Sequence, residues 1–252
     1  MVTHCLPLPR IAPLFEKSPG VMDLISSYLY LRRAIGIIGI LVPIVLPIGY
    51  AVSTGHDRLL ASVSTYYYTD MRNIFVGSMC AVGVFLLCYR LTPLDDLLTS
   101  IVGAAAILVA LCPTVPPNPS TIATVVGYLH IAFAAILLVG FALISWFIFT
   151  QPDPARPLPD PQQGDPGSRK NLRNVIYRGC AIVIVAGVAL AVLSSQLPRS
   201  FVHTYHPLFW CEAVATFAFG VSWLIKGQTL FRDGPGPSAQ PAVVLSEEPL
   251  PS

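Results

Sequence analysis

The chain has 252 residues, of which 54% are hydrophobic and 11% are charged, and its formal net charge is +2. Because soluble domains carry about 25% charged residues, this composition excludes an ordinary soluble enzyme. The small net charge gives no basis for nucleic-acid binding.

The first segment, 1–24, contains several prolines and is predicted to be a flexible cytoplasmic extension. Six apolar stretches follow, at 34–52, 74–89, 97–111, 122–149, 175–193 and 209–225. Each is long enough, or nearly so, to cross a hydrocarbon layer about 30 Å thick as a helix. We therefore predict an all-α polytopic membrane protein, with one domain at 25–232 that is a bundle of six transmembrane helices.

The two other polar segments carry no predicted fold of their own. Residues 150–174 are rich in proline and should form an extended cytoplasmic linker between the fourth and fifth spans. Residues 233–252 have little to bury and are predicted to be a disordered cytoplasmic tail.

The positive charges predict the orientation of the spans. Only three of the 15 Lys and Arg residues, Arg58, Arg72 and Arg199, lie in the first, third and fifth connections. The others lie in the N-terminal segment, in or beside the second and fourth connections, and after the sixth span. Because cytoplasmic loops are enriched in Lys and Arg, both termini are predicted to be cytoplasmic, in the cell membrane. The first span should serve as an uncleaved signal anchor.

Unusual polar residues gather in the predicted outer connections and at the nearby ends of spans. The candidate ligand-binding residues are Tyr66, Tyr67, Asp70, Arg72, His130, His203, His206 and Glu212. Ionisable groups at membrane depth are costly unless they face a partner or water, so they mark functional sites. We predict that these side chains share an outward-facing pocket.

Each candidate also has a structural interpretation that the sequence leaves open. The tyrosines, together with Trp210, are also typical of an interfacial aromatic belt. Asp70 and Arg72 are close enough in sequence to form a local ion pair. Glu212 could place negative charge near a helix N-terminus, and His130 could form a hydrogen bond between helices.

The histidines and cysteines allow two further hypotheses. His203 and His206 are three residues apart, which on a helix would suit a two-ligand metal half-site. Pro207 favours a loop instead, so we expect no metal and no cofactor, and the two histidines remain weak metal candidates. Cys112 and Cys211 are both predicted near the outer face, where a disulfide between them is conceivable.

Two passages carry a family resemblance: STYYYTDMRNIFVGSMCAVGVFLLCYR at 64–90 and WCEAVATFAFGVSWLIKG at 210–227. They resemble a pattern in bacterial multi-span membrane proteins that are grouped under domains of unknown function. More loosely, the chain is similar to the membrane hydrolase superfamily that includes alkaline ceramidases, in which a Ser, an Asp and three His arrange zinc for amide hydrolysis. The residues of matching type are Ser62 or Ser64, Asp70, His130, His203 and His206. That superfamily has seven spans and a His-x-x-x-His pair, whereas this chain has six predicted spans and His-x-x-His.

The leading functional prediction is non-enzymatic: recognition or passage of a small molecule, an ion or a lipid at the outer leaflet. Zinc-dependent hydrolysis of the ceramidase type and a scaffold role in a membrane complex remain as alternatives. The lipid bilayer is the one partner that the sequence predicts, and no nucleic acid is expected. Catalytic residues and oligomeric state stay open.

Overall fold

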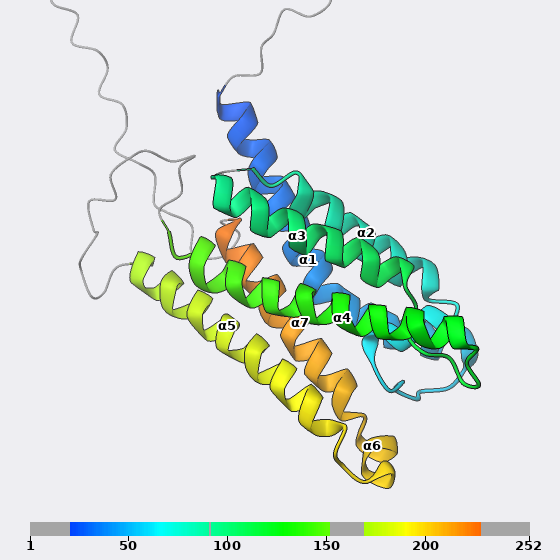
Figure 1. Cartoon of the computed structure of the whole chain (residues 1–252). Coiled ribbons are helices and arrows are strands. Elements are labelled where there is room, and N and C mark those ends of the chain that lie inside the picture. The colour runs from blue at the N-terminus through cyan, green and yellow to red at the C-terminus, as the bar shows by residue number, and fades with distance from the viewer. Residues whose placement is uncertain (1–20, 91, 152–168, 228–252) are drawn as a thin grey trace, which may run out of the picture.

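The computed structural model describes residues 21–90, 92–151 and 169–227, and within these ranges all regular structure is helical (Figure 1). The elements are α1 (Val21–Thr54), the 3-10 helix η1 (Val63–Tyr68), α2 (Arg72–Leu87), α3 (Pro93–Leu111), α4 (Thr121–Leu143), the π-helix η2 (Ile144–Ile148), α5 (Arg169–Ser194), α6 (Arg199–Tyr205) and α7 (Pro207–Lys226). The predicted tail at 233–252, residues 1–20 of the N-terminal segment and residues 152–168 of the linker lie outside the described part.

Five helical segments are long and apolar enough to cross a membrane: Ser27–Thr54, Pro93–Leu111, Thr121–Ile148, Asn171–Ser194 and Pro207–Lys226. Over the described residues this confirms the predicted all-helical structure, and the five segments indicate a multi-pass membrane protein. The remaining predicted span, 74–89, corresponds to α2, which has 16 residues and is therefore about 24 Å long. The predicted linker is shorter than expected, because α5 already begins at Arg169.

Capping residues explain where several helices begin. The Thr92 hydroxyl accepts a hydrogen bond from Asp95 N–H, and Pro93 stands at the first helical position, where it removes no helical hydrogen bond. Ser120 caps α4 in the same way by accepting from Ala123 N–H. Thr92 therefore marks the end of the connection before α3, and Ser120 marks the end of the connection after it.

Glycines set the closest helix crossings. A Cβ at Gly220 of α7 would lie 2.7 Å from the Gly36 carbonyl oxygen of α1. A Cβ at Gly83 of α2 would likewise lie 2.7 Å from the Gly103 carbonyl oxygen of α3. Backbones this close exclude any side chain at the crossing, as is typical of packed membrane helices. These contacts hold α1 against α7 and α2 against α3.

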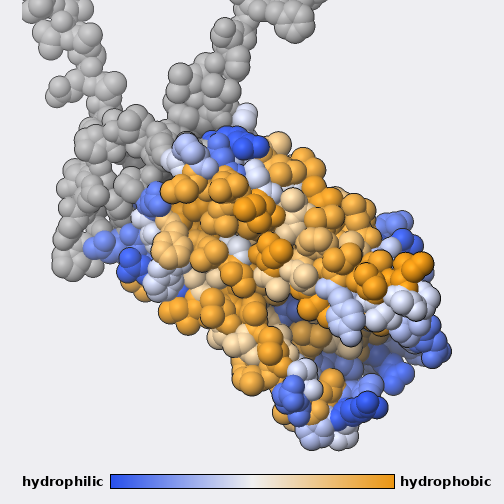
Figure 2. All heavy atoms as spheres, viewed as in Figure 1, coloured by the Kyte–Doolittle hydropathy of each residue, from blue (hydrophilic) through white to orange (hydrophobic). Residues whose placement is uncertain are grey.

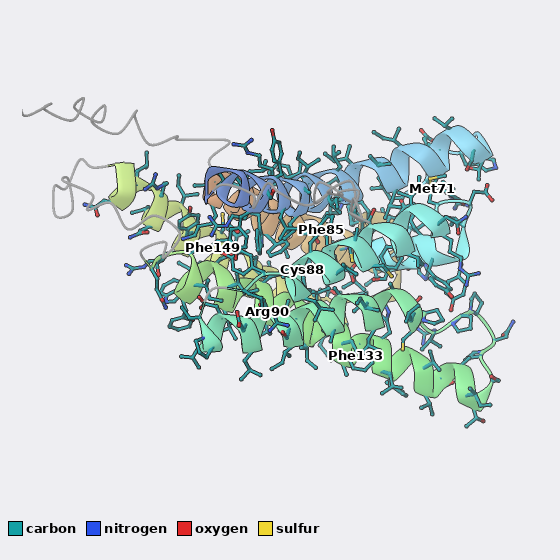
Figure 3. The ribbon with its side chains drawn as sticks, turned by 90° about the horizontal axis from the view of Figure 1, so that it is seen from above. Met71, Phe85, Cys88, Arg90, Phe133 and Phe149 are labelled. Carbon is teal, nitrogen blue, oxygen red and sulfur yellow. The ribbon has the colours of Figure 1, made fainter. Side chains whose placement is uncertain are left out.

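The bundle has two polar ends joined by an apolar body. We call the end that carries η1 and α6 the tyrosine end, and the end that carries Arg32, Arg33, Arg90 and Lys226 the arginine end. Figure 2 shows hydrophobic side chains over most of the body on the visible face, with hydrophilic ones gathered toward the two ends. Figure 3 shows Met71 and Cys88 at opposite ends of α2.

Candidate functional site

A pocket lies in the half of the bundle near the tyrosine end, between α1, η1, α2, α3, α4 and α7. Its empty volume is about 490 Å³, open mouth included. The apolar lining residues are Val42, Val63, Phe75, Met79, Val109, Ala134, Leu137, Leu138 and Phe141, and the polar ones are Ser64, Glu212 and Thr216. We call this site the carboxylate pocket, because Glu212 is its one ionisable lining residue.

Glu212 reaches from α7 to the start of η1. Its Oε2 accepts a hydrogen bond of 2.7 Å from Val63 N–H, and the carboxylate also accepts one from Ser64 N–H. The next amide, Thr65 N–H, donates to the Ser62 hydroxyl over 3.1 Å. The first N–H groups of a helix have no partner within it, so Glu212 and Ser62 together complete the N-terminus of η1.

The same carboxylate has no cationic partner in the part of the chain that the structure describes. The one described ion pair joins Arg90 and Asp96 at the arginine end. An ionised carboxylate at membrane depth is stabilised by hydrogen bonds or by a positive charge. Here the two backbone amides of η1 provide hydrogen bonds to the carboxylate. A helix-dipole contact of Glu212 with its own helix, which the sequence left open, is replaced by this contact with η1.

Tyr66 is a core residue of the tyrosine end and does not line the pocket. It is fully buried, and its ring packs against Tyr50 of α1 and Phe209 of α7 with centroid distances of 5.9 and 6.3 Å. Its hydroxyl accepts a hydrogen bond from Leu60 N–H over 3.4 Å. Burial raises the pKa of Tyr66 above its ordinary value of 10.0. The interfacial role considered for this tyrosine is thus replaced by a packing role.

Tyr67 and Arg72 pair with each other at the surface. Arg72 Nη2 donates to the Tyr67 hydroxyl over 2.6 Å, and the guanidinium lies 4.3 Å from the centre of the Tyr67 ring. Asp70 is exposed, and within the described residues it forms no ion pair with Arg72. The ion pair considered from the sequence is therefore replaced by a cation–π contact. None of these three residues lines the carboxylate pocket.

His130 is buried and bonds to the backbone. Its Nδ1 lies 2.6 Å from the Cys112 carbonyl oxygen, at the C-terminus of α3. Because a carbonyl only accepts, Nδ1 carries the proton and donates. This is an interhelical hydrogen bond, which was the structural alternative to a ligand-binding role. His130 is one turn from Ala134 but is not part of the pocket lining.

His203 and His206 lie apart from the pocket lining too. His203 is exposed on α6, and His206 ends that helix with a left-handed φ of 47°. The expectation of a plain loop was thus wrong for His203, because α6 continues to Tyr205. Within the described residues, no group of three or more His, Cys, Asp or Glu side chains could hold a metal. Cys112 and Cys211 are free thiols, so the disulfide considered between them is not formed.

The arginine end contains a buried basic residue, Arg32, which was not among the predicted site residues. Arg32 is 1% exposed, and its guanidinium lies 4.7 Å from the centre of the Tyr28 ring. Its Nη2 donates to the Tyr89 hydroxyl over 3.0 Å, and its Nη1 donates to the Lys226 carbonyl over 3.3 Å. The spacing of four between Tyr28 and Arg32 is the signal that could have shown this contact.

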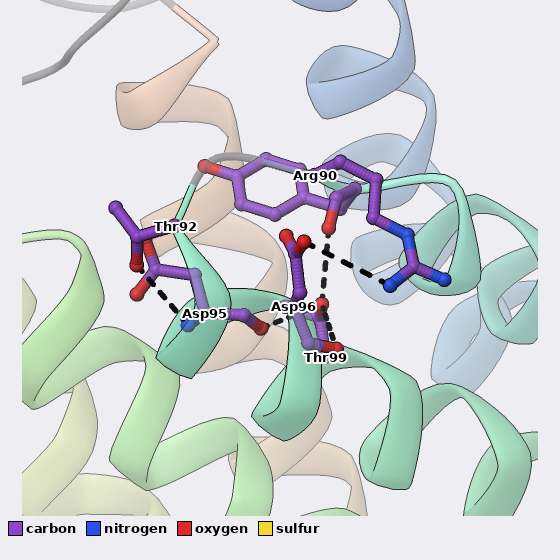
Figure 4. A network of polar contacts seen from close by, with 6 residues as sticks. Arg90, Thr92, Asp95, Asp96 and Thr99 are labelled. Carbon is purple, nitrogen blue, oxygen red and sulfur yellow. Dashed lines mark hydrogen bonds and ion pairs between the residues drawn. The ribbon is translucent and has the colours of Figure 1, made fainter.

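The turn between α2 and α3 is held by its own network, shown in Figure 4. Arg90 Nη1 lies 3.9 Å from Asp96 Oδ2, and Thr99 donates to the Tyr89 carbonyl over 3.1 Å. Asp96 thus takes part in the local structure of this turn.

Of the predicted site residues, the structure therefore places only Glu212 in the pocket. Ser64 enters the sequence prediction through the hydrolase resemblance alone, and Thr216 does not enter it. Glu212 and Thr216 are four residues apart on an apolar helix, so they share a face, and this spacing is the signal that the sequence offers.

Comparison of the chain with protein-family models, with curated proteins and with solved structures finds no match.

Proposed function

We propose that this chain is an integral membrane protein that binds a small amphipathic molecule in the carboxylate pocket. The observation that carries the proposal is the lining itself: apolar side chains from five elements surround one carboxylate and two hydroxyls. Small-molecule sites are typically apolar concavities with a few placed polar groups. An apolar body with a polar head fits such a lining, whereas a bare ion would leave most of it unused.

The proposal includes the topology that the sequence predicts. We infer six spans, with α2 as the shortest, both termini in the cytoplasm and the tyrosine end outside. The grouping of Arg32, Arg33, Arg90 and Lys226 at one end supports this orientation, because such residues favour the cytoplasmic side. The carboxylate pocket would then belong to the outer half of the bilayer.

Ligand binding is tested by filling the pocket. Ala134→Phe places a ring among the lining residues, whereas Ile131→Phe adds a ring on the same helix at a side chain that is 59% exposed. We expect lipid extracts of purified wild type and Ile131→Phe to contain the same bound amphiphile by mass spectrometry, and Ala134→Phe to lack it. Identical extracts from all three proteins would contradict the proposal.

Topology is tested separately with single cysteines in a background without native cysteines. Asp57→Cys and Arg90→Cys are matched positions, because both residues are exposed and lie at opposite ends of the bundle. A maleimide that cannot cross membranes should label intact cells at position 57 and not at position 90. Labelling at position 90 alone would show that the orientation is opposite to the one inferred here. It would not contradict ligand binding in the pocket.

A further inference from the structure

We infer that the ligand of the carboxylate pocket is a long-chain amine that enters sideways from the bilayer, through the gap between α4 and the α5–α7 pair. This inference rests on the proposed function, and it adds the charge of the ligand, its apolar chain and its route. Three features of the structure support it: the open side of the pocket, a carboxyl group in an apolar lining with no Lys or Arg partner among the described residues, and the acceptor sites of that carboxyl group that η1 leaves unused.

The open side follows from the directions of the helices. Figure 1 shows α4 and α5 diverging toward the tyrosine end, with α7 behind the space between them. On this face Figure 2 shows a hollow between α4 and the α5–α7 pair, with hydrophilic atoms at its back. Glu212 and Thr216, from α7, are each only partly buried. The pocket is thus accessible from the side of the bundle.

The helices that border this gap carry apolar residues on their exposed faces. Ile131 of α4 is 59% exposed, and Val192 of α5 is 67% exposed. Both lie in segments that are long and apolar enough to cross a membrane. A side opening between such helices faces lipid, so a molecule that enters there is already dissolved in the bilayer. This favours an occupant with a hydrocarbon chain.

The charge of the occupant follows from Glu212. Within the described ranges no Lys or Arg forms an ion pair with this carboxylate. A carboxylate has about four acceptor sites, and the Val63 and Ser64 amides use two of them. The remaining sites suit a donor that carries positive charge, because hydrogen bonds between charged groups are about twice as strong as neutral ones. A primary ammonium has three N–H donors, and the hydroxyls of Ser64 and Thr216 can accept from it.

The size of the pocket limits how much of the chain it holds. The volume of about 490 Å³ includes the mouth, so the inner part accepts the head group and the first carbons. The rest of the chain has to leave between α4 and α5 and remain among the lipids. A straight-chain dodecyl amine is therefore a suitable probe.

The test uses the full chain in nanodiscs of phosphatidylcholine, with dodecylamine, dodecanol and dodecanoate as probes. We expect saturable binding of dodecylamine that is about tenfold or more tighter than binding of dodecanol, and no binding of dodecanoate. Glu212→Gln should remove this preference, while the amide oxygen of the new side chain still accepts from Val63 N–H. Its fold is checked by tryptophan fluorescence, and Ala134→Phe, which keeps the carboxylate, should weaken binding of both dodecylamine and dodecanol.

The outcomes separate the two proposals. Equal binding of dodecanol and dodecylamine, or an unchanged preference in Glu212→Gln, would overturn the amine and leave the proposed function standing. A failure of all three probes to show saturable binding would contradict both. The route is tested with a dodecylamine that carries a diazirine at its chain end, which should label α4 and α5. Labelling confined to residues 55–62 would overturn lateral access.

Discussion

The crossing of α1 and α7 at Gly220 allows a sharp test of the packing that positions the pocket. In Gly220→Ala, the new Cβ would lie 2.7 Å from the Gly36 carbonyl oxygen and 2.8 Å from the Ile40 backbone nitrogen. Real Cβ atoms essentially never come within 3.0 Å of a non-bonded heavy atom. The Gly36 oxygen and the Ile40 nitrogen belong to the backbone, so neither can move aside as a flexible side chain could. The two helices must therefore move apart.

The magnitude follows from two opposing terms. Forcing an extra methyl group into a packed core costs about 1–3 kcal/mol, and the rigid backbone places this site at the upper limit. Alanine in place of glycine favours a helix by about 1 kcal/mol, which leaves a net loss of about 2 kcal/mol. For a chain of this size the loss corresponds to a fall in Tm of about 4–8 °C.

The assay is unfolding in mixed detergent micelles, followed by tryptophan fluorescence, because Trp223 is fully buried less than one turn from Gly220. The matched control is Gly77→Ala on α2, where a Cβ would meet no atom within 4 Å. We expect the control to be at least as stable as wild type. Equal stability of Gly220→Ala and the control would refute the close approach of α1 and α7, and with it the geometry of the carboxylate pocket.

The remaining predictions concern three buried polar groups. His130→Ala leaves the Cys112 carbonyl without its donor and should lower the free energy of unfolding by about 1–3 kcal/mol, whereas His56→Ala, at an exposed position, should change it by less than about 0.5 kcal/mol in the same micelle assay. Tyr66 should stay protonated as the pH rises past 10.0, because burial raises its pKa. The unfolded chain ionises this tyrosine first, so the protein should lose stability above that pH. Near-ultraviolet absorbance should show a late-titrating tyrosinate component that Tyr66→Phe removes. Arg32→Lys removes the planar group that contacts two rings and should cost about 1–3 kcal/mol of unfolding free energy, whereas Arg90→Lys should cost less than about 0.5 kcal/mol; equal effects would contradict the burial of Arg32.

Helix content and membrane embedding could be predicted from the sequence because they depend on local composition. Apolar runs of about 20 residues have few other solutions, so α1, which contains 34–52, and α4 with η2, which cover nearly all of 122–149, lie where the hydropathy predicts helices. Their ends were less accurate. The first residues of α5 are polar and basic, at Arg169 and beyond, and hydropathy gives no sign that a helix has already begun there.

The members of the carboxylate pocket were harder to predict because they come from six elements that only tertiary packing brings together. Hydropathy does not show which face of α4 turns inward, and Ala134 and Leu137 look like any other apolar residues of that helix. Polar residues were predicted as ligand-binding because they stand out in an apolar sequence, although a structural role explains several of them. Tyr66 and His130 are conspicuous in sequence, but each forms a hydrogen bond with the backbone and is buried in the core.

Glu212 could be predicted as important, but its place in the chain does not show how one carboxylate serves two purposes. It completes the N-terminus of η1 through Val63 N–H, and it also lines an apolar pocket. These two roles respond differently to substitution. An amide at position 212 keeps an acceptor for the backbone and loses the charge, so the position of η1 should be retained while an ammonium group loses its partner. Because Ser62 caps η1 independently through Thr65 N–H, the 3-10 helix does not depend on Glu212 alone. The position of η1 therefore does not require a negative charge at residue 212. For this reason we propose that the carboxylate serves ligand recognition.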